Sequence, residues 1–371
     1  MRTFFYFGEL QTPMYQWQRR NHIDELQRNG HEIITFNPYD YTSMDEANEK
    51  AILELDKAGH IDLFLACDDQ TVIYPETVKK VSAKGIPSCL ICWDNLELPF
   101  KQKKIAPLFD VVWLTSWETQ YLFEKWKCKK IIFQPYAANP YAYKAYQGLQ
   151  QINAVGFIGS PYGSRTNTLN ELLVNSIVCS LYSDSYFKKG YNTSVGGRKK
   201  VDVRDIAIKA SRYLRFPIGR KVLFSTLLNK FKKSSGLDTD SPYALLNKSV
   251  SDEEMSKLYS QFALSLNISS LRDTYILKNP IPKIHLRTFE IPMSGGLQFT
   301  SYNDEIASYF EEDKEIVLYH DQDEMIDKAK FYLDPKQEKV VNSMKKAARI
   351  RAENDHTWTK RFNKIFEVLY Q

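Results

Sequence analysis

The chain has 371 residues, of which 43% are hydrophobic and 13% aromatic, and its formal net charge is +5 at pH 7. This composition excludes a chain without a packed core, and the length predicts about two globular domains. The apolar start meets Glu9 at once and no eighteen apolar residues follow one another, so we expect a soluble cytoplasmic protein with neither a signal peptide nor a membrane span.

The cysteines form an odd and sparse set, with three of the five inside hydrophobic runs. They are Cys67, Cys89, Cys92, Cys128 and Cys179. This usage favours reduced thiols over a disulfide framework. Cys89 and Cys92 have the C-x-x-C spacing, but no second pair of ligands lies nearby, so we expect a buried strand there and no metal site.

The first 140 residues alternate short apolar runs with helical segments. A helical run over 15–28 ends at Asn29-Gly30, which is a helix C-cap signal. Strands are expected at residues 3–7, 31–36, 61–66, 87–93, 111–115 and 130–134. This alternation predicts a parallel sheet with helices on both faces, forming a Rossmann-like domain.

Polar residues follow several of these strands, and the carboxyl ends of parallel strands share one edge of a sheet. They are Gly8, Glu9, Asp68, Asp69, Asp94, Asn95 and Ser116. Asp94 comes directly after an apolar strand and before a loop with a proline, which is how a carboxylate is delivered to a cleft as a proton acceptor. A helix N-cap or a solvated loop residue is an equally good interpretation.

A second sheet pattern starts after a hinge at 138–140. The strand 153–158 runs into the loop Gly159-Ser160-Pro161-Tyr162-Gly163-Ser164, then Arg165 and a helix over 166–175. Loop N–H groups at a helix N-terminus attract anions, and Arg165 would add a positive charge. The loop lacks the spacing and the lysine of a P-loop, so a turn without a ligand remains the alternative.

The positive charge is concentrated in residues 187–233, which hold fourteen Lys or Arg and two Asp and leave a charge of −7 for the rest of the chain. Its second half, 214–233, joins bulky apolar residues to Lys and Arg, which suits an anionic membrane surface or a lipid-linked polyanion. A helix with a solvated basic face is the alternative. No nucleic-acid motif accompanies the charge, and we expect no nucleic-acid partner.

The stretch 285–300 forms a helix-to-strand corner. The strand 262–268 precedes it with Asn267 near its end, and a loop over 271–283 carries Arg272. Arg287 and Glu290 lie on one helical face, where they could meet phosphate and ribose, and Ser294-Gly295-Gly296 lets a backbone approach a ligand. An ordinary helix C-cap with an intrahelical ion pair explains the same residues.

The last part adds a strand at 315–319 and helices at 303–310, 323–333, 337–354 and 357–369. We therefore expect an acceptor-side domain at 1–140, a second Rossmann-like domain at 141–354 with the basic insertion 187–233, and a terminal segment 355–371 whose helix returns to the first domain.

Six segments together resemble a known family. They are Gly30-His31-Glu32, Val155-Gly156-Phe157-Ile158-Gly159-Ser160 with Arg165, Ser265-Leu266-Asn267-Ile268, Arg287-Thr288-Phe289-Glu290-Ile291-Pro292, Ser294-Gly295-Gly296 and His356-Thr357-Trp358. In this combination the chain resembles the CgeB-like glycosyltransferases, which belong to the group-1 glycosyltransferases of the GT-B fold. The likeness covers most of the chain and is most specific from Phe262 onward.

The resemblance implies an α/β protein of two facing Rossmann-like domains with an interdomain cleft, and transfer of a hexose from a nucleotide-diphosphate sugar with retention and without a metal or another cofactor. By position Glu290 would hold the ribose, Ser294, Gly295 and Gly296 would lie near the donor phosphates, and Arg287 and Arg165 would offset the diphosphate charge. Asp94 and Arg287 are then the catalytic candidates. The remaining donor-site candidates are Gly159, Ser160, Asn267 and Arg272.

The sequence departs from the family at Pro282. Many group-1 enzymes have a second glutamate there, eight residues before the one matched by Glu290, in contact with the donor sugar. The sugar, the nucleotide base, the stereochemical course and the acceptor, whether a surface polysaccharide, a lipid-linked glycan or a protein, therefore stay open. A sugar-nucleotide-binding protein without activity and a membrane-docked assembly scaffold remain alternatives.

Overall fold

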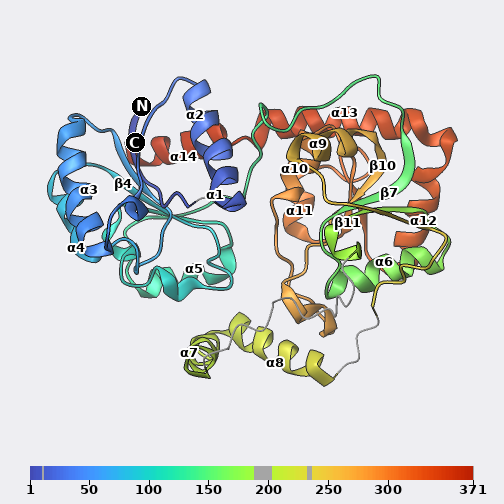
Figure 1. Cartoon of the computed structure of the whole chain (residues 1–371), viewed down its shortest axis with the longest axis horizontal. Helices are drawn as coiled ribbons and strands as arrows, with labels where there is room; N and C mark the ends of the chain where they lie inside the picture. Colours follow the sequence, from blue (N-terminus) through green and yellow to red (C-terminus); the bar gives the residue numbers. More distant parts are fainter. Residues whose placement is uncertain (11, 188–202, 232–235, 371) are drawn as a thin grey trace. The chain divides into compact units, whose positions relative to one another are not determined.

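The computed structural model describes residues 1–10, 12–187, 203–231 and 236–370. The chain divides into two compact units, one of Met1–Asn139 with His356–Gln371 and the other of Pro140–Asp355 (Figure 1). Within the described ranges each unit contains a parallel sheet of six strands. Each unit therefore has its own core.

The sheet of the first unit has the strand order β2-β1-β3-β4-β5-β6. Its central strands are buried along their whole length, as expected when helices cover both faces. The strands are β1 (Arg2–Tyr6), β2 (Glu32–Phe36), β3 (Leu63–Ala66), β4 (Ser88–Cys92), β5 (Val111–Leu114) and β6 (Ile131–Phe133). All six strands expected from the sequence are present.

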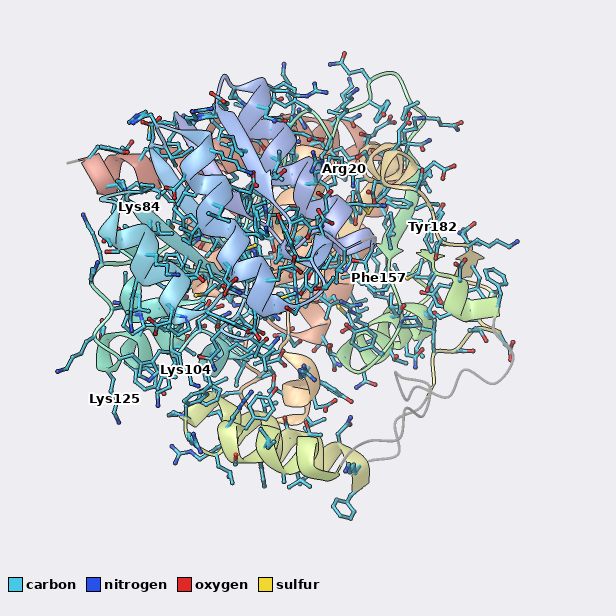
Figure 2. All side chains as sticks on the ribbon, turned by 60° about the vertical axis from the view of Figure 1, so that its left-hand side comes forward. Arg20, Lys84, Lys104, Lys125, Phe157 and Tyr182 are labelled. Atoms are coloured by element: carbon cyan, nitrogen blue, oxygen red, sulfur yellow. The ribbon has the colours of Figure 1, made fainter. Side chains whose placement is uncertain are left out.

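In the described ranges six α-helices belong to the first unit. They are α1 (Pro13–Gln18), α2 (Asp24–Arg28), α3 (Met44–Ala58), α4 (Pro75–Ala83), α5 (Gln120–Lys125) and α14 (Trp358–Tyr370). The run predicted over 15–28 is not one regular helix, because a π-helical turn, η1 (Arg19–Ile23), separates α1 from α2. The surface of this unit is basic in places, with Lys84, Lys104 and Lys125 projecting from it (Figure 2).

Helix α14 packs on the first unit although it ends the chain. The backbone N–H and the hydroxyl of Thr359 both donate to Glu25 Oε1, at 2.7 and 2.8 Å. Arg361 donates through Nε to the carbonyl of Pro135 at 3.2 Å, and Trp358 is fully buried. These contacts make the last helix part of the N-terminal core.

The sheet of the second unit has the order β12-β11-β10-β7-β8-β9. Its core includes Val155, Phe157, Leu264 and Phe299 from the central strands. The strands are β7 (Ile152–Ile158), β8 (Cys179–Tyr182), β9 (Ala244–Asn247), β10 (Phe262–Leu266), β11 (Gln298–Ser301) and β12 (Val317–Tyr319). The strands β8 and β9, of four residues each, were not expected from the sequence.

In the described ranges six α-helices cover this sheet, and some of them begin with a side-chain cap. They are α6 (Ser164–Val174), α9 (Asp252–Gln261), α10 (Arg287–Met293), α11 (Asp304–Tyr309), α12 (Gln322–Leu333) and α13 (Glu338–Asp355). Ser251 and Glu254 form a capping box at α9, and Asn303 accepts from the Ile306 N–H at α11. Polar side chains thus satisfy N–H groups that the first helical turn leaves without partners.

Helices α7 (Val203–Tyr213) and α8 (Pro217–Phe231) belong to the basic segment and lie outside the layers that cover the second sheet (Figure 1). Residues 188–202 and 232–233 of that segment lie outside the described residues. The predicted loop over 271–283 contains a short 3-10 helix, η7 (Arg272–Ile276), against which α8 packs. In the described ranges no helix is long and apolar enough to cross a membrane.

Candidate functional site

Two guanidinium groups meet at the carboxyl end of β7 in the second unit. Gly159 follows this strand with φ of +149°, and a Cβ built there would lie 3.0 Å from Arg287 Nη2 and 3.6 Å from Arg165 Nη1. A side chain at Gly159 would therefore displace Arg287 and would carry the strain of a positive φ. The glycine keeps open the space in front of two cations that come from α6 and α10.

The loop after β7 orients Arg165. Its Nη1 donates to the Ser160 carbonyl at 3.2 Å, and its Cζ lies 4.4 Å from the centre of the Tyr162 ring. Burial lowers the pKa of Arg165, and the neighbouring Arg287 lowers it further. Two like charges held this close repel each other, so an anion between or beside them would be stabilised.

The backbone of the same loop contributes less than the sequence had indicated. The Gly159 N–H donates to the Tyr182 carbonyl of β8 at 3.0 Å, so it is used inside the sheet. Gly163 is the N-cap of α6 and offers no side-chain acceptor to the first turn. At the start of α6 the Arg165 N–H is likewise used, since it donates to the Tyr162 carbonyl at 3.2 Å, so the side chain of Arg165 is the larger contribution of this loop to an anion site.

Arg287 is the first residue of α10 and sits between two further polar groups, Tyr259 and Glu290. Burial disfavours its charge, but Tyr259 and Glu290 outweigh burial and hold the pKa of Arg287 above its ordinary value. Burial raises the pKa of Tyr259 to about 12. The Tyr259 hydroxyl is buried and makes no hydrogen bond of normal geometry, although it lies near the guanidinium.

Glu290 is 5% exposed and accepts a hydrogen bond of 2.7 Å from the hydroxyl of Tyr143 at Oε1. Tyr143 lies in the segment that leads from the first unit into β7, and its own carbonyl accepts from Arg349 of α13. A bond of this length to a carboxylate fixes one oxygen and with it the plane of the group. Tyr143 was not predicted, because no local pattern in the sequence links it to α10.

His285 is a second residue that the sequence reasoning missed. Burial lowers its pKa to about 3, with Lys283, Arg165 and Arg287 acting in the same direction. The imidazole is therefore neutral at pH 7 beside a cluster of cations. The sequence feature that could have identified His285 is its position directly before α10, within the stretch 285–300 that was predicted to form the site.

Asn267 and Arg272 are not part of this cluster. Asn267 is 2% exposed, and its side-chain amide donates to Thr288 Oγ1 at 3.2 Å and to Gln298 Oε1 at 3.4 Å. It therefore fastens α10 and β11 to the end of β10. Arg272 is exposed and begins η7 with a φ of +44°. Their assignment to the donor site stays a prediction.

Ser294-Gly295-Gly296 forms a tightly packed corner. The Ser294 carbonyl accepts from Ser260 Oγ at 2.6 Å, and Ser294 itself is fully buried. A Cβ at Gly295 would lie 2.8 Å from Ala145 Cβ, and one at Gly296 would lie 2.9 Å from the Tyr259 carbonyl. Packing within the unit therefore already explains why these residues are small, and their contact with donor phosphates stays a prediction.

The first unit holds a pocket of about 370 Å³ at the carboxyl ends of β3 and β4. Asp94 is exposed at this pocket. The lining residues are Tyr15, Tyr39, Cys67, Asp68, Asp69, Thr71, Val72, Trp93, Asp94, Leu98, Lys101 and Gln102. The pocket thus joins three aspartates to aromatic rings, a lining that suits a polyhydroxylated ligand.

Asp68 is the most perturbed carboxylate of this pocket. Burial raises its pKa to about 6 and the charge of Asp69 adds to the rise, while a hydrogen bond from the Gly8 N–H at 3.1 Å opposes it. Asp68 therefore changes charge close to neutral pH, as a general acid or base does. The neighbouring Asn95 has a structural task, since its Oδ1 accepts from the backbone N–H groups of Thr115 and Ser116.

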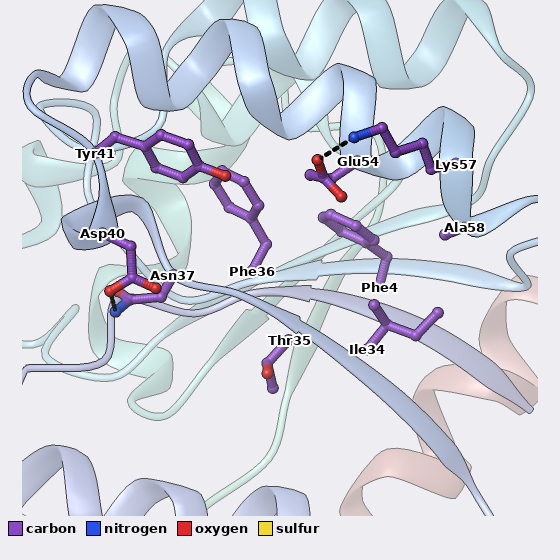
Figure 3. Close-up of a pocket in the computed structure, with 10 residues that line it drawn as sticks. All are labelled: Phe4, Ile34, Thr35, Phe36, Asn37, Asp40, Tyr41, Glu54, Lys57 and Ala58. Carbon is purple, nitrogen blue, oxygen red and sulfur yellow. Dashed lines mark hydrogen bonds and ion pairs between the residues drawn. The ribbon is translucent and has the colours of Figure 1, made fainter.

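Two further pockets flank the edge strand β2. One of about 400 Å³ lies between β2 and α3, where Glu54 pairs with Lys57 at 2.8 Å and Asn37 donates to Asp40 at 2.7 Å (Figure 3). The other, of about 570 Å³, is bordered by the Glu9–Arg19 ion pair at 2.9 Å. Their polar groups are engaged with one another. In the described ranges no three His, Cys, Asp or Glu side chains lie close enough to hold a metal ion.

Comparison with known proteins adds a family and a fold. Residues 230–367 match a family described as "Glycosyl transferase-like", and no curated protein matches in sequence. Over its whole length the chain is similar to an alpha-glucosyltransferase solved with UDP and a 13-mer DNA containing a HMU base, with a TM-score of 0.60, 12% identity and coverage of 100% of both chains. The chain has the GT-B fold.

Other solved structures agree. Alr3699/HepE of Anabaena, in complex with UDP and glucose, has a TM-score of 0.57 at 10% identity and is covered over 99% of its length by the entire chain. Sucrose-phosphate synthase of Thermosynechococcus elongatus has a TM-score of 0.53 at 11% identity, covered over 98% by the entire chain. At such identities the likeness establishes the fold, and the family match includes α10 and supports a glycosyltransferase. The CgeB-like subgroup stays a prediction.

Proposed function

We propose that this protein is a glycosyltransferase that moves a sugar from a nucleotide-diphosphate donor to a hydroxyl of a glycan, a lipid-linked glycan or a protein, without an obligatory metal. The observation that carries the proposal is the pair Arg165 and Arg287 at Gly159. Two half-buried cations on the end of a parallel sheet suit a diphosphate, whose charge grows as it leaves the sugar.

Each arginine has a distinct task in the proposal. Arg287 is kept charged by the neighbouring Glu290 and Tyr259, which raise its pKa, and it acts on the departing diphosphate, where a guanidinium offers two parallel N–H donors to phosphate oxygens. Arg165 is held by the Ser160 carbonyl and the Tyr162 ring. Its charge neutralises the other side of the diphosphate. Together they supply the positive charge that a metal ion provides in other transferases.

Glu290 is proposed to bind the ribose hydroxyls of the donor. Tyr143 fixes the plane of the carboxylate, so the group is oriented before the ligand arrives. Solved structures of the same fold contain UDP or UDP-glucose, which makes uridine donors the first to test. A hexosyl donor and retention of configuration belong to the same proposal.

On the acceptor side we assign Asp94 as the group that orients the acceptor hydroxyl or takes its proton. It stands at the pocket of the first unit, and Asp68 in the same pocket changes charge at a pH of about 6. Aromatic rings from Tyr15, Tyr39 and Trp93 offer apolar faces to a sugar. The acceptor would be a glycan of a surface polysaccharide, free or linked to lipid or protein.

The test is a panel of UDP, GDP, TDP and CMP sugars, read first as a thermal shift and then as hydrolysis or transfer. A bound donor stabilises only the native state and raises the melting temperature. We expect one nucleotide to give the largest shift and to be turned over. If no nucleotide sugar shifts the melting temperature, the proposal is wrong.

A second candidate is a sugar-nucleotide-binding protein without activity. Pro282 favours it, since this residue stands in the place of the family's second glutamate and pairs through an isolated backbone bridge with Ser270. Donor binding without turnover in the presence of acceptors would support this candidate. A cytoplasmic position at the inner face of the membrane, reached through residues 187–233, would fit either candidate with a lipid-linked partner.

A further inference from the structure

Helix α8 is anchored to the second unit along one face. Gly219, Val222 and Ser225 are buried, and the Thr226 hydroxyl and the Asn229 amide both donate to Asp273 of η7, each at 3.0 Å. Tyr275 adds a hydrogen bond of 2.9 Å to Asn229 Oδ1. These contacts fix the rotation of α8 about its axis.

The opposite face of α8 carries an apolar stripe in solvent. Phe224 is 56% exposed, Leu227 55%, Leu228 41% and Phe231 86%. Their spacing is i, i+3, i+4 and i+7, which places four large side chains along one side of a helix. Such a stripe is ordinarily buried, and a contiguous exposed patch of this kind marks an interaction surface.

The charges around the stripe have one sign. Residues 206–231 contain six Lys or Arg and no Asp or Glu. Arg220, Lys221 and Lys230 are exposed on α8, and Arg212 and Arg215 are exposed next to it. On other surface helices of this unit a lysine is paired with a glutamate of the same helix, as Lys257 is with Glu253 of α9. The basic character of α8 is thus not offset within the helix.

We propose that α8 docks on an anionic lipid surface, with Phe224, Leu227, Leu228 and Phe231 entering the boundary between headgroups and acyl chains and the basic residues meeting lipid phosphates. A helix of this kind lies in the plane of the interface. A nucleic acid would satisfy the charges but would leave the apolar stripe in water. A second copy of the chain would bring one basic helix against another, which like charges oppose.

This inference stands apart from sugar transfer, because lipid binding is measured without donor or acceptor. If transfer also holds, docking places the enzyme at the surface where a lipid-linked acceptor lies. The anchoring of α8 through Asp273 then has a further consequence. Because the helix does not rotate freely, the stripe is presented to the bilayer without an ordering cost at binding.

The experiment is co-sedimentation of the full chain with vesicles of phosphatidylcholine, either pure or with about 30% phosphatidylglycerol. We expect binding to the anionic vesicles only. The variant F224Q/L228Q removes half of the stripe without touching the buried face and should bind at least ~10-fold more weakly. R220Q/K221Q should bind more weakly too and depend less steeply on salt, because two of the basic residues named above are removed.

A matched control is F331Q, because Phe331 lies on α12 of the same unit and is 50% exposed. This variant should bind vesicles as the unchanged protein does. The inference is overturned if the unchanged protein does not bind anionic vesicles, or if F224Q/L228Q binds as tightly as F331Q. A dimer in solution that F224Q/L228Q alone converts to monomer would instead show that a second copy covers the stripe.

Discussion

The two units are each built on a six-stranded parallel sheet, with different strand orders, and they carry opposite electrostatics at their strand ends. In the second unit the strand end at Gly159 is faced by Arg165 and Arg287, whereas in the first unit the ends of β3 and β4 open into a pocket with Asp68, Asp69 and Asp94. Both sites lie where parallel sheets place their ligands. The difference shows that the fold supplies the position and the loop residues supply the chemistry.

The glycines make the same distinction inside the second unit. Gly159 leaves open a place in front of two cations, while Gly295 and Gly296 have no Cβ because Ala145 and the Tyr259 carbonyl occupy that space. A small residue therefore indicates a ligand only when the neighbouring atoms belong to groups that could bind one. The four predictions below separate the basic site from the acidic one.

The largest effect is expected for Arg287→Ala. Removing the guanidinium should lower kcat by roughly 100- to 1,000-fold, because a fixed charge that acts on the leaving group is lost. The measurement is donor turnover at saturating donor, with the melting temperature as a check on folding. Arg351→Ala on α13 is the control, since this arginine pairs only with surface carboxylates in the contacts described for it. If the two variants had equal kcat, Arg287 would have no role in catalysis.

Asp94→Asn tests the acidic site. Transfer to the acceptor should fall by roughly 100-fold while donor affinity is unchanged, since general-base assistance is lost but the second unit is intact. The comparison is with Asp40→Asn, another exposed aspartate that lines the other pockets of the first unit. If Asp94→Asn weakens donor binding instead, the division of tasks between the two units is wrong.

Glu290→Gln separates donor binding from turnover. The glutamine keeps the volume and can accept from Tyr143, so the change removes the charge that faces the ribose and Arg287, and we expect the donor Kd to rise about 10-fold. Titration calorimetry with the nucleotide alone measures it. An unaltered Kd would contradict the ribose role, and Glu253→Gln at the exposed end of α9 should leave binding unchanged.

The smallest effect concerns pH. The native pKa of Asp68 is raised to about 6, so the folded protein binds a proton there that the unfolded chain has already released. Stability of the unchanged protein relative to Asp68→Asn should therefore be highest below the unfolded pKa of 3.8 and fall by about 1 kcal/mol as the pH rises through about 6, after allowance for partial exposure. Chemical denaturation at several pH values measures the difference in unfolding free energy between the two proteins. A difference that does not change with pH would mean that Asp68 is solvated as in the unfolded chain.

Much of the fold followed from local patterns. The apolar runs of the first 140 residues predicted every strand of the first sheet. Two strands of the second sheet were missed, β8 and the edge strand β9, and each has only four residues. The π-helical turn η1 was also missed, because hydrophobic periodicity does not distinguish it from a regular helix.

The site was predicted in part, because its residues come from distant segments. Arg287 was indicated by its own helix, but Tyr143, which orients Glu290, lies in a linker with no motif. Asn267 followed a strand as expected, and the structure uses its amide to hold Thr288 and Gln298. A sequence pattern predicts which helix, strand or loop carries a side chain. The residues that the side chain contacts depend on which strands become neighbours in the sheet.

The sequence by itself determined the alternation of strands and helices and the concentration of basic and apolar residues in one segment, because both depend on residues close together in the chain. Only the tertiary structure decided that Gly159 lies against Arg287 and that Tyr143 reaches Glu290. The physical reason is the strand order, which sets β10 beside β7 and brings the ends of β7 and α10 together across more than a hundred residues.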